Sequence, residues 1–307
     1  MRSHTSSRRF LFGVAAGAAL LMGVPATAQA ADPPFVGWSA LLPPGADAYQ
    51  PTSGDQCVAG RPGCVKHTIR KMSRRLKPLA ASCDHNAVFE LAYLRTTETY
   101  RKVAAQPGFF ADARFVNHED AVFANYYYTA YDSWAAGKRQ NVPQAWRIAL
   151  DAAAAHAVSG SGDLMLGMNA HVNADLPFVL AAIGLVAPDG SSRKPDHDKV
   201  NVFLNQVVQP LIDEEAARFD PAMDDAKGPY GLSYTALMQV LIGWRETAWR
   251  NAERLVNAPD AAAREQVARG IQDYAAATAR SLVPEFAYAP PVTDSTARDQ
   301  FCAAHHG

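Results

Sequence analysis

The sequence predicts an all-α protein: a single helical domain of about eight helices, preceded by an arm rich in proline and glycine. From Val65 onward, Ala-rich segments carry apolar residues at helical spacing, and Gly and Pro separate the segments. The alternation of Val, Ile and Thr that is typical of strands is nearly absent. With 307 residues, 49% of them hydrophobic, the chain can bury a sizeable core.

Each helix is expected where a periodic apolar run follows a start signal. Asp84, Asn117 and Asp260 stand just before such runs and are candidate N-caps. The helical domain is expected to cover residues 64–285, with residues 286–307 as a C-terminal tail. The expected helices lie near 65–80, 84–105, 117–137, 143–157, 161–186, 196–219, 229–257 and 260–282.

The first thirty residues are typical of a signal peptide, expected at 1–30. Arg8 and Arg9 precede a weakly apolar run at 11–24, and small residues fit a cleavage site after Ala30. The arginine pair favours the twin-arginine route, with a Sec signal as the alternative. The mature protein is therefore expected to be secreted or held in the cell envelope.

Charge and composition exclude some partners. Loss of Arg2, Arg8 and Arg9 with the signal would change the net charge from −1 to −4, since no acidic residue leaves with them. The basic cluster at 70–75 is local, and no basic stripe with interleaved aromatic residues is present, so a nucleic-acid partner is not expected. No further window is apolar enough for a transmembrane segment. Residues 31–63 contain six prolines and predict an irregular arm.

Four cysteines in a chain that is expected to be exported predict two disulfides. Three pairings are possible. The turn at 58–63 favours Cys57–Cys64, which leaves Cys83–Cys302 as the second bridge. A zinc site built from these cysteines is disfavoured, because none of them has C-x2-C spacing.

The segment 167–178, GMNAHVNADLPF, is the most informative stretch of the chain. Its polar and apolar residues alternate, as in a half-buried strand, but the segment also fits a helix, on which His171 and Asp175 share a face. The helical sequence on both sides and the depletion of Asn in strands favour the helix. Pro177 then predicts a kink or a fresh helix start just after this pair.

A His-x3-Asp pair on one helix turn suits a divalent metal, with zinc favoured, because an imidazole nitrogen and a carboxylate oxygen can converge on one ion. His171 and Asp175 are the expected first ligands. The remaining ligands are expected among Glu98, Asp120, His85, His118, Glu119, His197 and Asp198.

Each of these residues also has a structural interpretation. Asp175 is a candidate N-cap for the helix that restarts near Pro177, with His171 hydrogen-bonded in the core. A metal-free acid–base pair is a third possibility for the two. Asp120 suits an early helical turn through the helix dipole, and an ion pair would explain Glu98.

An aromatic face runs along the helix expected at 117–137. Tyr127, Tyr131 and Trp134 follow helical spacing there and are expected to line a cleft for a partly apolar, small-molecule or lipid-like substrate. Asn169 and Asn173, beside the His-x3-Asp pair, are expected to line the same cleft. The simpler interpretation of the aromatic face is that it forms core.

Five segments of the chain carry a resemblance to a known family: 90-ELAYLRTTETY-100, 120-DAVFANYYYTAYDSW-134, 143-PQAWRIAL-150, 164-LMLGMNAHVNADLP-177 and 198-DKVNVFL-204. They resemble a largely actinobacterial family of unknown function with a Gly-Met-Asn-Ala-His-x-Asn-x-Asp-Leu-Pro signature. The resemblance would cover about residues 65–255 and implies an all-helical domain in which Glu98, Asp120, His171 and Asp175 fall in recurring patterns.

The turn 171-HVNADLP-177 is also similar to zinc-dependent phospholipase C and the related single-strand nucleases, exported helical enzymes with a His-x3-Asp turn followed by Pro. The chain departs from that group, because Trp38 lies inside the arm rather than at the mature N-terminus, where the group has a metal-ligating Trp. A second His soon after the Pro is also lacking.

Together these observations predict an exported, metal-dependent hydrolase that acts on an ester or phosphoester of a partly apolar substrate. Glu98, Asp120, His171 and Asp175 would carry the chemistry around a metal-bound water. The alternatives are a non-catalytic secreted protein that binds an apolar small molecule, and a structural envelope protein. The sequence gives no oligomeric state.

Overall fold

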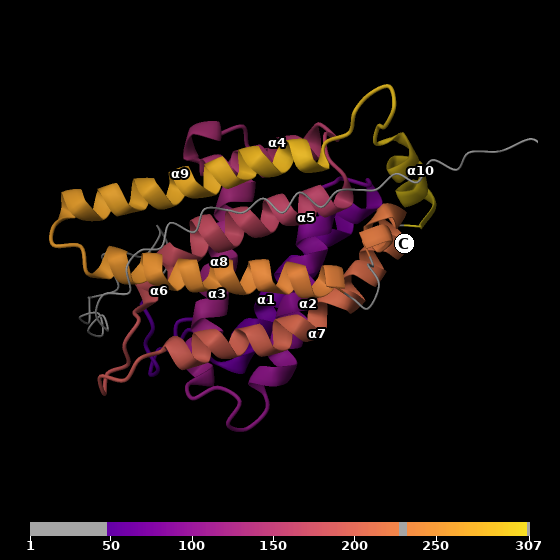
Figure 1. Ribbon diagram of the computed structural model, residues 1–307. Coiled ribbons are helices and arrows are strands. Elements are labelled where there is room, and N and C mark those ends of the chain that lie inside the picture. Colours follow the sequence, from indigo (N-terminus) through magenta and orange to yellow (C-terminus); the bar gives the residue numbers. More distant parts are fainter. Residues whose placement is uncertain (1–47, 227–231, 306–307) are drawn as a thin grey trace, which may run out of the picture. The chain divides into compact units, whose positions relative to one another are not determined.

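The computed structural model describes residues 48–226 and 232–305, and these residues form an all-helical domain (Figure 1). The predicted fold class is confirmed. The helices are α1 (Pro62–Ala81), α2 (Ala87–Ala104), α3 (Ala113–Ala135), α4 (Gln144–Ala154), α5 (Gly160–Asn169), α6 (Leu176–Ile183), α7 (Lys194–Arg218), α8 (Leu232–Val256), α9 (Ala261–Phe286) and α10 (Thr296–His305). Short helical turns stand between them at η2 (Arg139–Asn141), η3 (Ala170–Asp175) and η4 (Pro221–Ala226).

The expected helix at 161–186 is interrupted where Pro177 predicted an interruption. The chain passes from α5 into η3, which is a π-helical turn, and then into α6. The N–H of Leu176 bonds the carbonyl of His171, five residues back, as a π-helix requires. His171 and Asp175 therefore lie within the widened turn rather than on a regular α-helix.

Two of the three predicted N-caps act at or near a helix start. The carboxylate of Asp260 accepts the N–H of Ala263 at 2.7 Å in the first turn of α9. Asp84 accepts the N–H of Asn86, one residue before α2 begins. Both predictions place the helix start to within a few residues.

The prediction for Asn117 is wrong, because α3 begins four residues earlier than the apolar pattern suggests. Asp112 is its N-cap and accepts the N–H of Phe115. Asn117 lies buried inside α3, where it accepts a hydrogen bond from Tyr100 and donates one to the carbonyl of Gly60. Its polar group serves tertiary packing between α2, α3 and the arm.

The core is built from crossing layers of helices. In Figure 1, α9 lies along α4 and α5, and α1, α2 and α7 follow on the other side of the domain. The buried indoles of Trp146 on α4 and Trp249 on α8 are the largest side chains in this core. Aromatic rings of this size remove about 150–250 Å² each from water, so they contribute strongly to packing.

Both predicted disulfides are confirmed. Cys57 bonds Cys64 with a Cα–Cα distance of 4.8 Å, and Cys83 bonds Cys302 with a Cα–Cα distance of 5.9 Å. The second bridge ties α10, which lies in the segment expected to be a tail, to the turn before α2. The C-terminal segment is therefore part of the folded domain.

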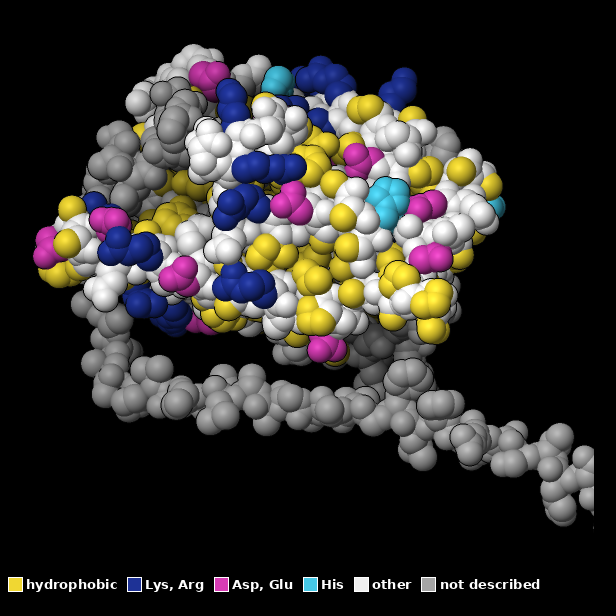
Figure 2. Space-filling model, turned by 90° about the horizontal axis from the view of Figure 1, so that it is seen from above, with side chains coloured by type: hydrophobic (Ala, Val, Ile, Leu, Met, Phe, Trp, Pro, Cys, Tyr) yellow, Lys and Arg dark blue, Asp and Glu magenta, His cyan; other side chains and the backbone are white. Residues whose placement is uncertain are grey.

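The expected signal peptide at 1–30 and the first part of the arm lie outside the described residues. Across 48–226 and 232–305, no helix combines the length and the apolar character that a bilayer crossing requires. On the face shown in Figure 2, basic and acidic side chains are interspersed.

Candidate functional site

An apolar cavity of about 160 Å³ is lined mainly by side chains of α2, α3, η3, α7 and α8. Five aromatic rings contribute to its wall: Phe89, Tyr93, Tyr100, Phe123 and Phe203. An apolar cavity of about 150 Å³ in another protein holds a benzene molecule, so this volume suits a ligand with one ring.

Four buried polar atoms on this wall have no hydrogen-bond partner within the described residues. They are Tyr93 Oη, Thr97 Oγ1, Asp120 Oδ2 and His171 Nε2. Buried polar groups are nearly always paired, because leaving one unpaired costs about 1–3 kcal/mol. The gathering of four such atoms on one cavity is the arrangement that a bound ligand would relieve.

His171 lines the cavity and is paired with Asp175, which is buried and does not line it. His171 Nδ1 lies 3.0 Å from Asp175 Oδ2, and the indole N–H of Trp146 donates to the same oxygen at 2.8 Å. With two donors on Asp175 Oδ2, we assign the proton of the imidazole to Nδ1, which leaves the lone pair on Nε2 facing the cavity. The ring of His171 is stacked on Phe123, with centroids 3.5 Å apart.

Burial dominates the protonation of this pair. It lowers the pKa of His171, so the imidazole is neutral at pH 7. Burial also raises the pKa of Asp175, and the hydrogen bonds from His171 and Trp146 oppose that shift. The side chain of Asp175 makes no cap bond to the backbone of α6, so the N-cap interpretation is wrong, and its hydrogen-bond partners are His171 and Trp146.

Two adjacent carboxyl groups face the same cavity from α3. Burial raises the pKa of Asp120 to about 8, and the neighbouring Glu119 carboxylate adds to the shift. Burial raises the pKa of Glu119 to about 7, although Arg245 and Arg193 act against it. Both groups are therefore largely or partly protonated near neutral pH when the cavity holds no cation.

Arg245 also reaches the cavity, but its guanidinium is held elsewhere. Its Nε donates to Asn201 Oδ1 at 2.8 Å, and its Nη2 donates to the carbonyl of His197 at 2.7 Å. His197 in turn lies with Nε2 3.2 Å from the carbonyl of Arg245. These two residues fasten α7 to α8, which accounts for His197 without a metal.

The model of DUF5995, a family of unknown function, matches residues 65–285. The chain belongs to the DUF5995 family. No curated protein and no solved structure matches it. This agrees with the expected resemblance to an uncharacterised all-helical family.

Three of the expected ligands, Glu98, His118 and Asp198, lie away from the cavity in this DUF5995 chain. Glu98 pairs with Arg95 at 2.7 Å near the surface, the ion pair that was the alternative explanation. His118 Nδ1 lies 2.9 Å from the carbonyl of Cys57, which anchors the disulfide loop to α3. Asp198 is also at the surface, where it pairs with Lys194.

The residues expected to line the substrate cleft do not line this cavity. Tyr127 is buried and donates to Glu90 at 2.8 Å, while Trp134 donates to Asp151 near the surface. Tyr131 packs beside Trp134. The cavity lies on a different side of α3, reached by Asp120 and Phe123. The aromatic face of α3 forms core, as its simpler interpretation held.

Asn169 and Asn173 likewise point to a neighbouring helix. Asn169 donates to the carbonyl of Ala275 on α9 at 2.9 Å, and Asn173 donates to Asn169 Oδ1 at 2.9 Å. Both are buried, and neither lines the cavity that His171 reaches. Their amides join η3 and α5 to α9.

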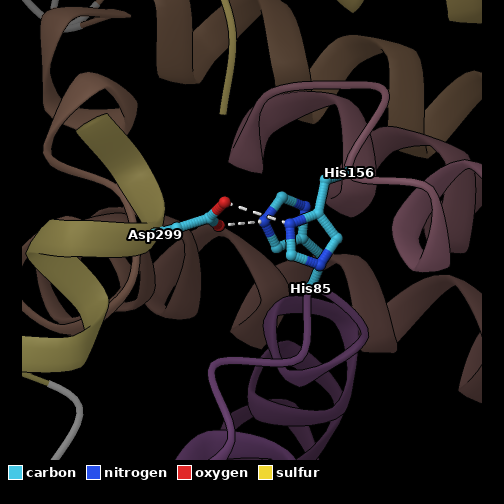
Figure 3. A group of neighbouring side chains, drawn as sticks. All are labelled: His85, His156 and Asp299. Carbon is cyan, nitrogen blue, oxygen red and sulfur yellow. Dashed lines mark hydrogen bonds and ion pairs between the residues drawn. The ribbon is translucent and has the colours of Figure 1, made fainter. Parts of the chain in front are cut away.

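His85 belongs to a separate cluster at α10, shown in Figure 3. His85 Nε2 and His156 Nδ1 lie 2.9 and 3.1 Å from the two oxygens of Asp299, and the two rings stack with centroids 4.0 Å apart. Among the described residues, His85, His156 and Asp299 lie close enough together that their ligand atoms could hold one metal ion. Glu98, Asp120, His171 and Asp175 do not form such a group.

Arg298 argues against a metal at this cluster. Its Nη1 lies 2.9 Å from Nδ1 of His85, and a guanidinium can only donate, so Nδ1 accepts and Nε2 carries the proton given to Asp299. A metal on Nε2 would require the opposite tautomer next to a fixed cation. Burial and Arg298 lower the pKa of His85 to about 4. The cluster is a hydrogen-bonded clamp that holds α10 on the domain.

Proposed function

We propose that this DUF5995 chain binds a small, largely apolar molecule in the cavity between α2, α3, η3, α7 and α8. The observation that carries the proposal is the set of four unpartnered polar atoms on an otherwise apolar wall. Ligand pockets commonly combine an apolar lining with a few convergent polar groups that fix the orientation of the ligand.

Hydrolysis of an ester held in the same cavity is a second candidate function, favoured by the His171–Asp175 pair. A neutral imidazole with its Nε2 lone pair in the cavity suits a general base. His171 Nε2 would take a proton from water while the water oxygen attacks the ester carbonyl carbon. The imidazolium would then return that proton to the leaving alkoxide, and Tyr93 Oη would donate a hydrogen bond to the carbonyl oxygen as it gains charge.

A metal-dependent form of this reaction, with zinc as the favoured ion, needs more converging ligands than the cavity offers. His171, Asp120 and Glu119 are the side chains on the wall that could ligate a metal, and Asp175 Oδ2 already receives two hydrogen bonds. Because His171, Asp120 and Glu119 do not converge into a group of metal-ligating geometry, the step above is derived without a metal. Elemental mass spectrometry of the purified protein tests this: stoichiometric zinc that is lost in His171→Ala would restore the metal-dependent mechanism.

Binding is tested by isothermal titration calorimetry with tert-butylbenzene, a neutral ring compound. We expect saturable binding at one site and a rise in Tm, because a ligand that binds only the folded state stabilises it. The substitution Ala92→Leu, on the cavity wall, should abolish binding while the fold is kept. Unchanged affinity in Ala92→Leu would place the ligand elsewhere and contradict the proposal.

Hydrolysis is tested with p-nitrophenyl esters of increasing acyl length. Loss of the general base in His171→Ala should lower kcat by about 10²–10⁴-fold. The matched control is His156→Ala, which removes a histidine of the α10 clamp and should leave the rate unchanged. Equal rates in His171→Ala and the parent would remove the catalytic proposal and leave the binding proposal intact.

We also propose that the chain is exported, since two disulfides form and persist in oxidising compartments. N-terminal sequencing of protein recovered from the culture medium or the envelope should begin at Ala31. Recovery of a full-length, reduced chain from the cytoplasm would contradict export.

A further inference from the structure

Two carboxyl groups on the cavity wall lack a cation in contact. Within the described residues, no hydrogen bond is made by the side chain of Glu119 or Asp120, and Asp120 Oδ2 is buried. Isolated carboxylates are costly to bury, because the attraction of a counter-ion is needed to offset their lost hydration. The wall is therefore short of positive charge at this end of the cavity.

The single guanidinium on the wall does not fill that role. Arg245 donates through Nε to Asn201 and through Nη2 to the carbonyl of His197, so two of its three nitrogens are held by α7. It lies beyond 4.0 Å from both carboxyl groups, and it affects Glu119 only through the longer-range field. Among the unpartnered atoms of the wall, Asp120 Oδ2 and His171 Nε2 accept hydrogen bonds, and the hydroxyls of Tyr93 and Thr97 are neutral. None of the four carries the positive charge that would attract an anionic ligand.

The aromatic rings beside these carboxyl groups point to the same ligand chemistry. Phe123 follows Asp120 by one helical turn, and Tyr93, Tyr100 and Phe203 complete this part of the wall. The faces of aromatic rings carry partial negative charge and attract organic cations, as in the aromatic cages that bind quaternary ammonium groups. Buried acids and aromatic rings together make a wall that favours a cation with an apolar surface.

We propose that the ligand of the cavity is an apolar organic cation, an ammonium compound whose charged head lies against Asp120 and Glu119 and whose apolar body fills the aromatic part of the wall. This inference rests on the proposed function, because it names the chemical class of the molecule bound in that cavity. The raised pKa values of Asp120 and Glu119, which desolvation causes, agree with it, since a cation in contact would favour the charged form of both groups.

The test compares three compounds of the same shape, each a phenyl ring with a tetrahedral head. Phenyltrimethylammonium is cationic, tert-butylbenzene is neutral and benzenesulfonate is anionic. Calorimetric titration of the full-length mature protein at pH 8 should give an affinity for the cation at least about tenfold above that for the neutral compound, as a desolvated cation–π and charge contact provides. Benzenesulfonate should not bind measurably.

Each other outcome is decisive. If the cation and the neutral compound bind equally, the charge of the head is not recognised: the proposed cavity function stands and this inference falls. If benzenesulfonate binds best, the cavity recognises an anionic head group through Arg245, and the inference is also overturned. If none of the three binds, the proposed function fails and takes the inference with it.

Variants then assign the preference to residues. Asp120→Asn and Glu119→Gln remove charge with little change of shape, and each should reduce the preference for the cation, with the double variant bringing it to within about twofold. Glu98→Gln is the matched control, because that carboxylate lies on α2 outside the cavity and is paired with Arg95. A preference that survives in the double variant would contradict the assignment.

Discussion

Replacing Thr97 with Val should stabilise the protein, which is unusual for a buried position. Thr97 is 1% exposed, and its hydroxyl finds no partner within the described residues. Val has nearly the same shape and the same branched Cβ, so neither the rotamer nor the helix is disturbed. The substitution therefore removes an unpaired polar group and leaves the packing of α2 unchanged.

The expected magnitude follows from the cost of that group. A buried hydroxyl without a partner costs about 1–3 kcal/mol, and a methyl group in its place adds apolar burial. A partial relaxation of the wall reduces the gain, so we expect the free energy of unfolding to rise by about 1–2 kcal/mol. For a domain of this size, that corresponds to an increase in Tm of roughly 2–6 °C.

Urea denaturation followed by circular dichroism measures the change. Thr129→Val is the matched control, since the exposed hydroxyl of Thr129 donates to the carbonyl of Asn125 at 2.8 Å, and its loss should change stability by less than about 0.5 kcal/mol. A loss of stability in Thr97→Val of 1 kcal/mol or more would refute the reasoning, because it would mean that the hydroxyl is paired in solution.

Three further predictions concern stability. Cys83→Ser/Cys302→Ser should lower the free energy of unfolding by about 3–5 kcal/mol, more than Cys57→Ser/Cys64→Ser, because the bridge spans 219 residues rather than 7; equal losses in urea titrations would contradict this. Gly167→Ala should cost about 1–3 kcal/mol in the same assay, because a methyl group there overlaps the ring of Phe89; an unchanged midpoint would show that the ring moves freely. Folding raises the pKa of Asp120, so between about pH 4 and pH 8 the folded state holds a proton that the unfolded state has lost. The free energy of unfolding should therefore fall as pH rises through that window, by up to about 1.4 kcal/mol per pH unit for this group. Glu119 adds to this slope, whereas Tyr93 and Tyr100 stay neutral and Arg245 stays charged over the same pH range. The substitution Asp120→Asn should therefore make stability depend less steeply on pH. An unchanged pH profile would show that the carboxyl group of Asp120 is in contact with water.

The helices were predictable because their signals are local. Ala-rich periodic runs, a cap such as Asp260 and an interrupting Pro177 each act within one or two turns of the chain, so the sequence alone indicates where helices begin and end. The cysteine pairing was also predictable, since the short turn between Cys57 and Cys64 leaves one partner for each remaining cysteine.

The cavity was only partly predictable, because it forms where several helices meet. Asp120 and His171 were found as charged or titratable groups in apolar surroundings, and both line the cavity. Thr97 and Arg245 were not singled out as site residues, since a Thr among apolar residues and an Arg on a long helix are common in any core or surface. The separation of Glu98 from Asp120 depends on which faces of α2 and α3 meet, and one sequence does not specify that.

The π-helical turn explains how His171 is held on this cavity wall by Asp175. Pro177 has no N–H, so the carbonyl of Asn173 loses its α-helical donor, and the chain accommodates this by widening the turn. Gln272 on α9 donates to the neighbouring carbonyl of Ala174 at 3.3 Å and so ties the widened turn to α9. A widened turn is less stable than a regular one, and it persists here because α9 supports one side while Trp146 holds Asp175 on the other. The same local irregularity that weakens the helix therefore fixes an imidazole with its Nε2 turned to the cavity, which is the position that either ligand binding or proton transfer would require.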